Sequence, residues 1–165
     1  MFKLSCCSHS NIDMASTDKK LPEIDNDVNC ATWETSKPFV PEIHFCKVIK
    51  VYDGDTITIA TKLHEMSPVY RFSVRLNGID TPEIKTHSKT EKELAIKAKE
   101  FLSGMILDKM VELKNISTEK YGRLLADVYF EGCSMNSLMI SSGYAVEYNG
   151  GKKEIPDTWK DSVNS

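Results

Sequence analysis

The chain has 165 residues and a formal net charge of −3 at pH 7. This length suffices for one domain with a substantial core but not for two of ordinary size, and no apolar stretch is long enough to cross a bilayer. The acidic balance excludes a large basic surface that would bind nucleic acid without regard to sequence, so any such binding must come from a local site.

Residues 1–42 are polar and show no sustained strand or helix periodicity, which predicts a flexible leader. The first twenty residues lack the continuous apolar run of a secretory signal peptide, so we expect an intracellular, cytoplasmic protein. Met14 is an alternative start. Cys6 and Cys7 are candidates for S-acylation, and only in that case do we expect a membrane association.

Strand patterns begin at residue 43. An apolar run precedes the turn at Asp53, alternating residues follow over 56–59, and a second alternating run covers 70–77. In this second run the period of two places Arg75 on the face opposite to the core-directed side chains.

The next predicted element is an amphipathic helix over residues 91–107, because apolar residues recur there at helical spacing. Thr90 and Glu93 form a capping box at its start. Two further strands and a short helix follow, at 110–116, 124–130 and 135–142.

The order of three strands, helix, two strands and helix has too few strands for a sandwich and lacks the alternation of a doubly wound sheet. A five-stranded OB-type β-barrel with helices, an α+β fold, fits it best. The predicted organisation is a leader of residues 1–42, a barrel domain of residues 43–151 and a C-terminal tail of residues 152–165.

Carboxylates and arginines gather in short turn-forming segments between the predicted strands. Carboxylates and carbonyls bind hard cations such as Ca²⁺, and guanidinium groups bind phosphate. Each segment alone is an ordinary turn, but together they describe a place where a metal and two guanidinium groups hold one phosphodiester. The segments are Asp53-Gly54-Asp55, Asp80-Thr81-Pro82-Glu83 and Lys120-Tyr121-Gly122-Arg123, with Arg75 shortly before the second.

In order, spacing and residue identity these segments closely resemble the staphylococcal nuclease (thermonuclease) family, over roughly residues 44–150. The resemblance implies the OB-fold and a Ca²⁺-dependent endo/exonuclease that hydrolyses DNA or RNA, prefers single strands and leaves 3′-phosphate ends. It also implies a role for each matching residue. These are Asp55, Asp80 and the Thr81 carbonyl as metal ligands, Glu83 as general base, Arg75 and Arg123 as phosphate ligands that stabilise the developing charge, and Tyr121 and Lys120 as substrate-binding residues.

The alternative is a non-catalytic nucleic-acid-binding or scaffold module on the same fold. Degenerate members of the family typically lose the carboxylates or arginines, and this chain retains them. The aromatic pair that packs on a base in the bacterial enzyme is not clearly matched; Tyr144 and Tyr148 are candidates, and Tyr144 is equally a candidate for the core. Nucleic acid is the expected partner, and no obligate protein partner is inferred.

Overall fold

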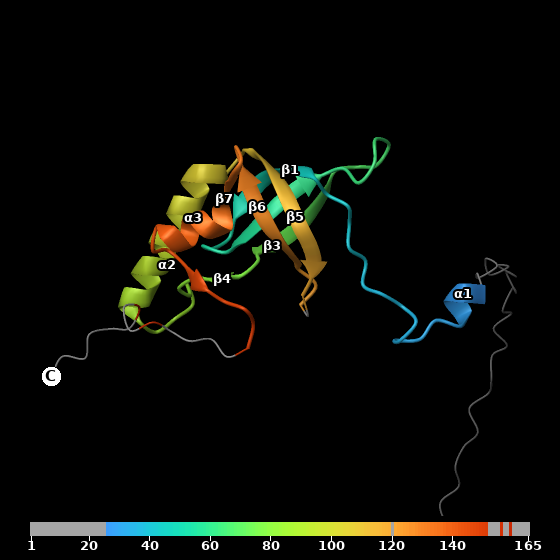
Figure 1. Cartoon of the computed structure of the whole chain (residues 1–165), viewed down its shortest axis with the longest axis horizontal. Helices are drawn as coiled ribbons and strands as arrows, with labels where there is room; N and C mark the ends of the chain where they lie inside the picture. The colour runs from blue at the N-terminus through green and yellow to red at the C-terminus, as the bar shows by residue number, and fades with distance from the viewer. Residues whose placement is uncertain (1–25, 120, 152–155, 157–158, 160–165) are drawn as a thin grey trace, which may run out of the picture. The chain divides into compact units, whose positions relative to one another are not determined.

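The computed structural model describes residues 26–119, 121–151, 156 and 159, and the chain divides into two units, Met1–Lys37 and Pro38–Ser165. In the first unit the described residues include one short helix, α1 (Asn26–Asn29). The second unit carries the strands and the two longer helices shown in Figure 1. The cysteine pair at positions 6 and 7 and most of the predicted tail lie outside the described residues.

Five strands of the second unit close into a barrel (Figure 1). Along the sheet their order is β3-β2-β1-β5-β6, with antiparallel neighbours throughout. The barrel closes because β3 also pairs with β6 in parallel, with Val74 opposite Leu124. The predicted five-stranded OB-type barrel with helices is therefore confirmed. The strands are β1 (Phe45–Val51), β2 (Thr56–Thr61), β3 (Tyr70–Leu76), β5 (Met110–Thr118) and β6 (Leu124–Phe130).

Alternation along the strands builds the core. In β3, Val74 and Leu76 are fully buried, and Arg75 between them points to the other face, as the sequence predicted. Register shifts interrupt β1 between Val48 and Lys50 and the β5–β6 pairing after Lys114. Such irregularities bend strands, and bending is what lets a small sheet close on itself.

Two helices cover part of the barrel: α2 (Lys89–Ile106) packs on β1, α3 (Met135–Ser141) packs on β6, and the helices contact each other (Figure 1). The predicted capping box of Thr90 and Glu93 is wrong. The helix begins two residues earlier, with extended Ser88 as N-cap and its side chain accepting the N–H of Glu91. Ser88 and Glu91 have the same spacing as the predicted pair, so the sequence offered two registers of one signal.

Short strands complete the arrangement. β4 (Ile79–Asp80) pairs antiparallel with β8 (Val146–Glu147), which fixes the segment around Asp80 against the chain that follows α3. β7 (Cys133–Ser134) extends the main sheet beside β6. In the described part of the chain, no helix combines the length and hydropathy that a membrane span requires.

Candidate active site

The turn of residues 53–55 is seated tightly between α2 and the segment after β4. The Asp53 carboxylate accepts the backbone N–H of Asp55 at 3.2 Å, which closes the turn. A Cβ atom added to Gly54 would lie 2.9 Å from the Ala98 Cβ and 2.9 Å from the Thr81 Cγ2. Glycine is needed here for the close approach, and it brings Asp55 next to the second predicted segment.

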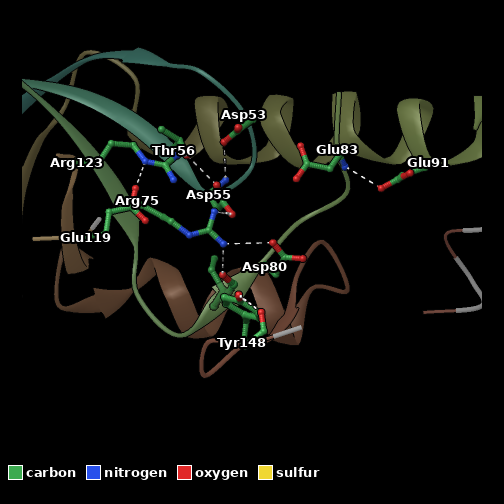
Figure 2. Close-up of polar contacts among 12 residues, drawn as sticks. Asp53, Asp55, Thr56, Arg75, Asp80, Glu83, Glu91, Glu119, Arg123 and Tyr148 are labelled. Carbon is green, nitrogen blue, oxygen red and sulfur yellow. Dashed lines mark hydrogen bonds and ion pairs between the residues drawn. The ribbon is translucent and has the colours of Figure 1, made fainter. Parts of the chain in front are cut away.

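Arg75 lies between two buried carboxylates (Figure 2). Its Nη1 donates to Oδ2 of Asp55, and its Nη2 donates to Oδ1 of Asp80 at 3.2 Å and to the carbonyl of Ile79 at 3.1 Å. The strand register explains the first contact, since Thr56 pairs directly with Arg75 across β2 and β3. The structure thus brings together three of the residues that the sequence selected.

Burial sets the electrostatics of this cluster. It raises the pKa of Asp55 to about 7, and the charge of Arg75 and the hydroxyl of Thr56 reverse only part of that shift. Burial acts to lower the pKa of Arg75, but the carboxylates of Asp55 and Asp80 outweigh it and raise this pKa overall. When both aspartates are ionised, two negative charges face one positive charge in a largely buried place. An added cation would be favourable there.

A chain of hydrogen bonds joins the second predicted arginine to this cluster (Figure 2). Arg123 lies in the loop between β5 and β6, where its Nε donates to Glu119 Oε1 and its Nη1 donates to Thr56 Oγ1 at 3.5 Å. Thr56 Oγ1 in turn donates to Asp55 Oδ1 at 2.8 Å. Sequence reasoning gave Thr56 no role, although it follows Asp55 in the first segment, and did not single out Glu119. The spacing of four residues between Glu119 and Arg123 is the signal that could have suggested Glu119.

The same loop holds the predicted substrate-binding residues. Tyr121 is strongly exposed, and Gly122 beside it has a φ of 78°, which non-glycine residues rarely adopt. Its N–H donates to the Glu119 carbonyl at 2.9 Å and makes the loop a tight turn. Lys120 lies outside the described residues.

Glu83 is held through its backbone. Its side chain is exposed, whereas its N–H donates to Oε1 of buried Glu91 at 3.1 Å. The other carboxylate oxygen of Glu91 accepts the Thr86 hydroxyl at 2.6 Å. The first turn of α2 therefore fixes the loop that carries Glu83. Sequence reasoning missed Glu91, because it assigned the helix start two residues too late.

The two tyrosines left open by the sequence have different environments. Tyr144 stacks on Phe101, with ring centres 4.5 Å apart, and packs on the core. The ring centre of Tyr148 lies 5.9 Å from the guanidinium carbon of Arg75. Tyr148 and Arg75 both line a cleft of about 660 Å³, together with residues 149–151. Tyr148 is therefore the aromatic residue of this pair that adjoins the carboxylate–arginine cluster.

Thr81 follows Asp80 directly and is buried beside Gly54. With it, the structure places the predicted metal ligands Asp55, Asp80 and Thr81 around one end of β2 and β4. Glu83 stands further along the same segment, beside α2 (Figure 2).

Comparison with known proteins gives a consistent result. The family described as "Staphylococcal nuclease homologue" matches residues 73–161. An uncharacterised endonuclease of Haemophilus influenzae is 34% identical over 65% of this chain and 54% of its own length. A probable endonuclease of Schizosaccharomyces pombe is 38% identical over 47% and 37%, respectively, and an uncharacterised endonuclease of Escherichia coli O157:H7 is 28% identical over 62% and 60%. The chain thus spans about half the length of these curated relatives.

Proposed function

Because the chain belongs to the family of staphylococcal nuclease homologues, we propose that it hydrolyses phosphodiester bonds of DNA or RNA. The observation that carries the proposal is the position of Arg75 between two buried carboxylates, linked by hydrogen bonds to a second arginine. A phosphodiester repels an attacking hydroxide, and its charge increases in the transition state. Preorganised guanidinium groups and a cation are what such a reaction needs. The endonuclease names of the relatives support the same activity.

The two arginines bind the scissile phosphate in this proposal. A guanidinium group has five N–H donors in a rigid fork, and Arg75 commits donors to Asp55, Asp80 and the Ile79 carbonyl. Those bonds fix its orientation, and its remaining donors serve the phosphate oxygens. Arg123 faces a carboxylate, which has the acceptor geometry that a phosphate also presents.

We assign Ca²⁺ as the cofactor, held by Asp55, Asp80 and the Thr81 carbonyl. The donor set fits a hard cation, because it consists of oxygen atoms and carries more negative than positive charge. Within the described residues no group of three or more His, Cys, Asp or Glu side chains gathers, so the protein would supply few ligands. Ca²⁺ tolerates this when water and substrate fill the remaining positions. When bound, it would supply positive charge that polarises a phosphate oxygen.

Glu83 is assigned as the group that orients the attacking water and takes its proton. Its exposed side chain is reachable by water, and Glu91 holds the loop that carries it. A preference for single strands follows if a base stacks on Tyr148, since both faces of a paired base are already covered by its neighbours. The 3′-phosphate product is the outcome that the family resemblance implies.

The test is a cleavage assay with single-stranded DNA, duplex DNA and RNA, each in Ca²⁺, in Mg²⁺ and in EDTA. We expect single strands to be cut fastest. Cleavage should be fast in Ca²⁺, slow in Mg²⁺, which demands a stricter octahedral shell, and absent in EDTA. The products should resist extension by a polymerase until a phosphatase removes the 3′-phosphate. Full activity in EDTA would refute the assignment of Ca²⁺ as cofactor. Products that a polymerase extends directly would refute the assignment of a 3′-phosphate product.

A matched pair of variants distinguishes the nuclease from the alternative, a binding module without activity. Arg75→Lys replaces the fork by a point charge and should remove most of the cleavage. Arg71→Lys alters an exposed arginine four residues earlier on the same face of β3 and should leave cleavage unchanged. Binding of a labelled strand without any cleavage by the unaltered chain would favour the binding module.

A further inference from the structure

A second hollow lies beside the candidate active site. It has a volume of about 280 Å³ and is lined by the end of β1, the loop after Asp80 and one side of α2. Asp53 and Glu83 form part of its wall, so it is continuous with the site, yet it shares no lining residue with the cleft of Tyr148. In Figure 2, Asp53 and Tyr148 lie on opposite sides of Arg75. The two depressions therefore flank the position proposed for the scissile phosphate.

Three lysines and a tyrosine give this hollow its chemistry. Lys50 and Tyr52 come from the end of β1 and the turn after it, Lys85 from the loop, and Lys99 from α2. Tyr52 is 48% exposed, and the Lys50 Nζ lies 5.8 Å from its ring centre.

Within the described part of the chain, none of the three lysines of this hollow (Lys50, Lys85 and Lys99) forms a salt bridge. The hollow holds three cationic side chains against two carboxylates, in a chain whose net charge is −3. The hollow thus has a small excess of positive charge although the whole chain is acidic, and it adjoins the site.

An exposed aromatic ring among lysines that form no salt bridge within the described residues matches one kind of ligand. A nucleotide within a strand presents a flat base that stacks on the ring and flanking phosphates that neutralise lysines. We propose that this hollow, the Tyr52 subsite, binds an unpaired nucleotide of the substrate strand one position beyond the nucleotide next to the bond that is cut. The proposal rests on the proposed nuclease function and adds a second contact with the strand, away from the cleft of Tyr148.

A strand explains the arrangement better than a free nucleotide does. One phosphate would need one or two of the lysines, whereas Lys50, Lys85 and Lys99 approach from three different segments and suit the two phosphates that flank a nucleotide within a strand. A strand held at Arg75 must also leave the active site, and the wall shared through Asp53 and Glu83 gives it a continuous path into the hollow.

The experiment measures kcat and KM of the full chain in saturating Ca²⁺, with a dinucleotide and with a single strand of about ten nucleotides, a length within the usual range of such sites. For Tyr52→Leu, KM for the longer strand should rise roughly tenfold while kcat changes little, the size expected when one stacked base is lost. For the triple variant Lys50→Ala/Lys85→Ala/Lys99→Ala, KM should also rise and should depend less on salt, because phosphate contacts are lost. The effect on the dinucleotide should be much smaller. Tyr52→Phe keeps the ring and should behave as the unaltered chain.

Two matched controls lie outside the hollow. Tyr70→Leu removes a tyrosine that is 42% exposed on β3, and Lys97→Ala removes an exposed lysine of the same helix as Lys99. Neither should raise KM. Equal losses on the dinucleotide and the longer strand, or equal losses in Tyr52→Leu and Tyr70→Leu, would overturn the subsite.

A binding measurement keeps this test separate from that of the nuclease function. If no substrate is cut, the nuclease function fails, and fluorescence anisotropy of the labelled strand then decides on the hollow by itself. Binding weakened by Tyr52→Leu but not by Tyr70→Leu supports the subsite. If a nucleoside monophosphate loses affinity for Tyr52→Leu as strongly as the longer strand does, the hollow binds free nucleotides and the proposal of a strand subsite is wrong.

Discussion

The two arginines of the candidate site are held in contrasting ways. Arg75 lies near the end of β3 on the face opposite to the core, its side chain is 16% exposed, and two buried carboxylates and a carbonyl hold it. Arg123 lies just before β6 at the end of a loop, its side chain is 31% exposed, and it forms its ion pair with Glu119 of the same loop. Buried groups thus hold the first arginine on several sides, whereas the second is held by a loop residue and by a 3.5 Å contact with Thr56.

The difference indicates how a small barrel can hold one substrate-binding side chain rigidly and present the other on an adjustable loop. A group buried among carboxylates is preorganised, but its loss leaves unpaired charges inside the protein. A group on a loop is adjustable, and a partly exposed ion pair with a residue of the same loop contributes less to folding than a buried one. We therefore expect the two arginines to be alike in catalysis and unlike in stability.

The largest expected effect tests this contrast directly. Arg75→Ala and Arg123→Ala should each lower kcat by about a hundredfold or more, the usual result of removing a donor to the transition state. In EDTA, Arg75→Ala should also lower the free energy of unfolding by about 3 kcal/mol, and Arg123→Ala by less than about 1 kcal/mol. Initial rates and urea unfolding measure the two quantities. Equal losses of stability would show that the contrast is wrong.

The next comparison is between the proposed base and a proposed metal ligand. Glu83→Gln should lower turnover by roughly two to four orders of magnitude, as expected for a general base, and should keep the rise in melting temperature that Ca²⁺ produces. Asp80→Asn removes one of the two negative charges that face Arg75 and repel each other. In EDTA this variant should therefore be at least as stable as the unaltered chain.

Asp80→Asn should then gain little stability from Ca²⁺, because a ligand that binds only the folded chain stabilises it in proportion to the affinity of the site. Thermal melts with and without Ca²⁺ decide between these outcomes. If Asp80→Asn and the unaltered chain show the same shift, Ca²⁺ binds elsewhere.

A smaller effect should follow from loosening the loop that carries Glu83. Glu91→Ala removes the acceptor of the Glu83 N–H and of the Thr86 hydroxyl. We expect kcat to fall by about tenfold while KM changes little, and stability to fall by about 1–2 kcal/mol. Hydrogen exchange at the Glu83 amide should become faster. Glu93→Ala, an exposed neighbour on α2, is the control; an equal loss in both would make Glu91 a general contributor to helix stability only.

The last comparison concerns the pH dependence of the metal-free protein. Burial raises the pKa of Asp55 to about 7 in the folded chain, whereas an unfolded aspartate titrates near its ordinary value of roughly 4. The folded state therefore binds this proton more tightly. The contribution of this proton to the free energy of unfolding is fully present below about pH 4 and is lost as the pH rises through about 7.

Urea unfolding in EDTA at several pH values between about 4 and 7 should show this loss of stability. Because other carboxylates titrate too, the informative quantity is the difference between the unaltered chain and Asp55→Asn, which has no proton to lose. The unaltered chain should lose stability relative to Asp55→Asn as the pH rises, by up to about 1 kcal/mol per pH unit. Parallel profiles would mean that Asp55 is not buried as the structure indicates.

The sequence predicted correctly those features that depend on residues close together in the chain. The period of two along β3 predicted which face Arg75 occupies, and the helical repeat behind residue 91 predicted α2 to within two residues. Two overlapping Ser/Thr-x-x-Glu patterns then gave the wrong cap, because each is locally acceptable. The choice depends on the buried contact that Glu91 makes with the preceding loop, and spacing does not reveal that contact.

The sequence by itself determined the barrel and the set of chemically suitable residues, since alternation, turn residues and residue type are properties of short segments. Only the tertiary structure decided that Asp55 and Asp80 share Arg75, that Thr56 and Glu119 connect Arg123 to them, and that Tyr148 adjoins the cluster while Tyr144 joins the core. Those relations depend on strand register, on the closure of β3 against β6 and on burial, which are fixed only when distant segments pack together.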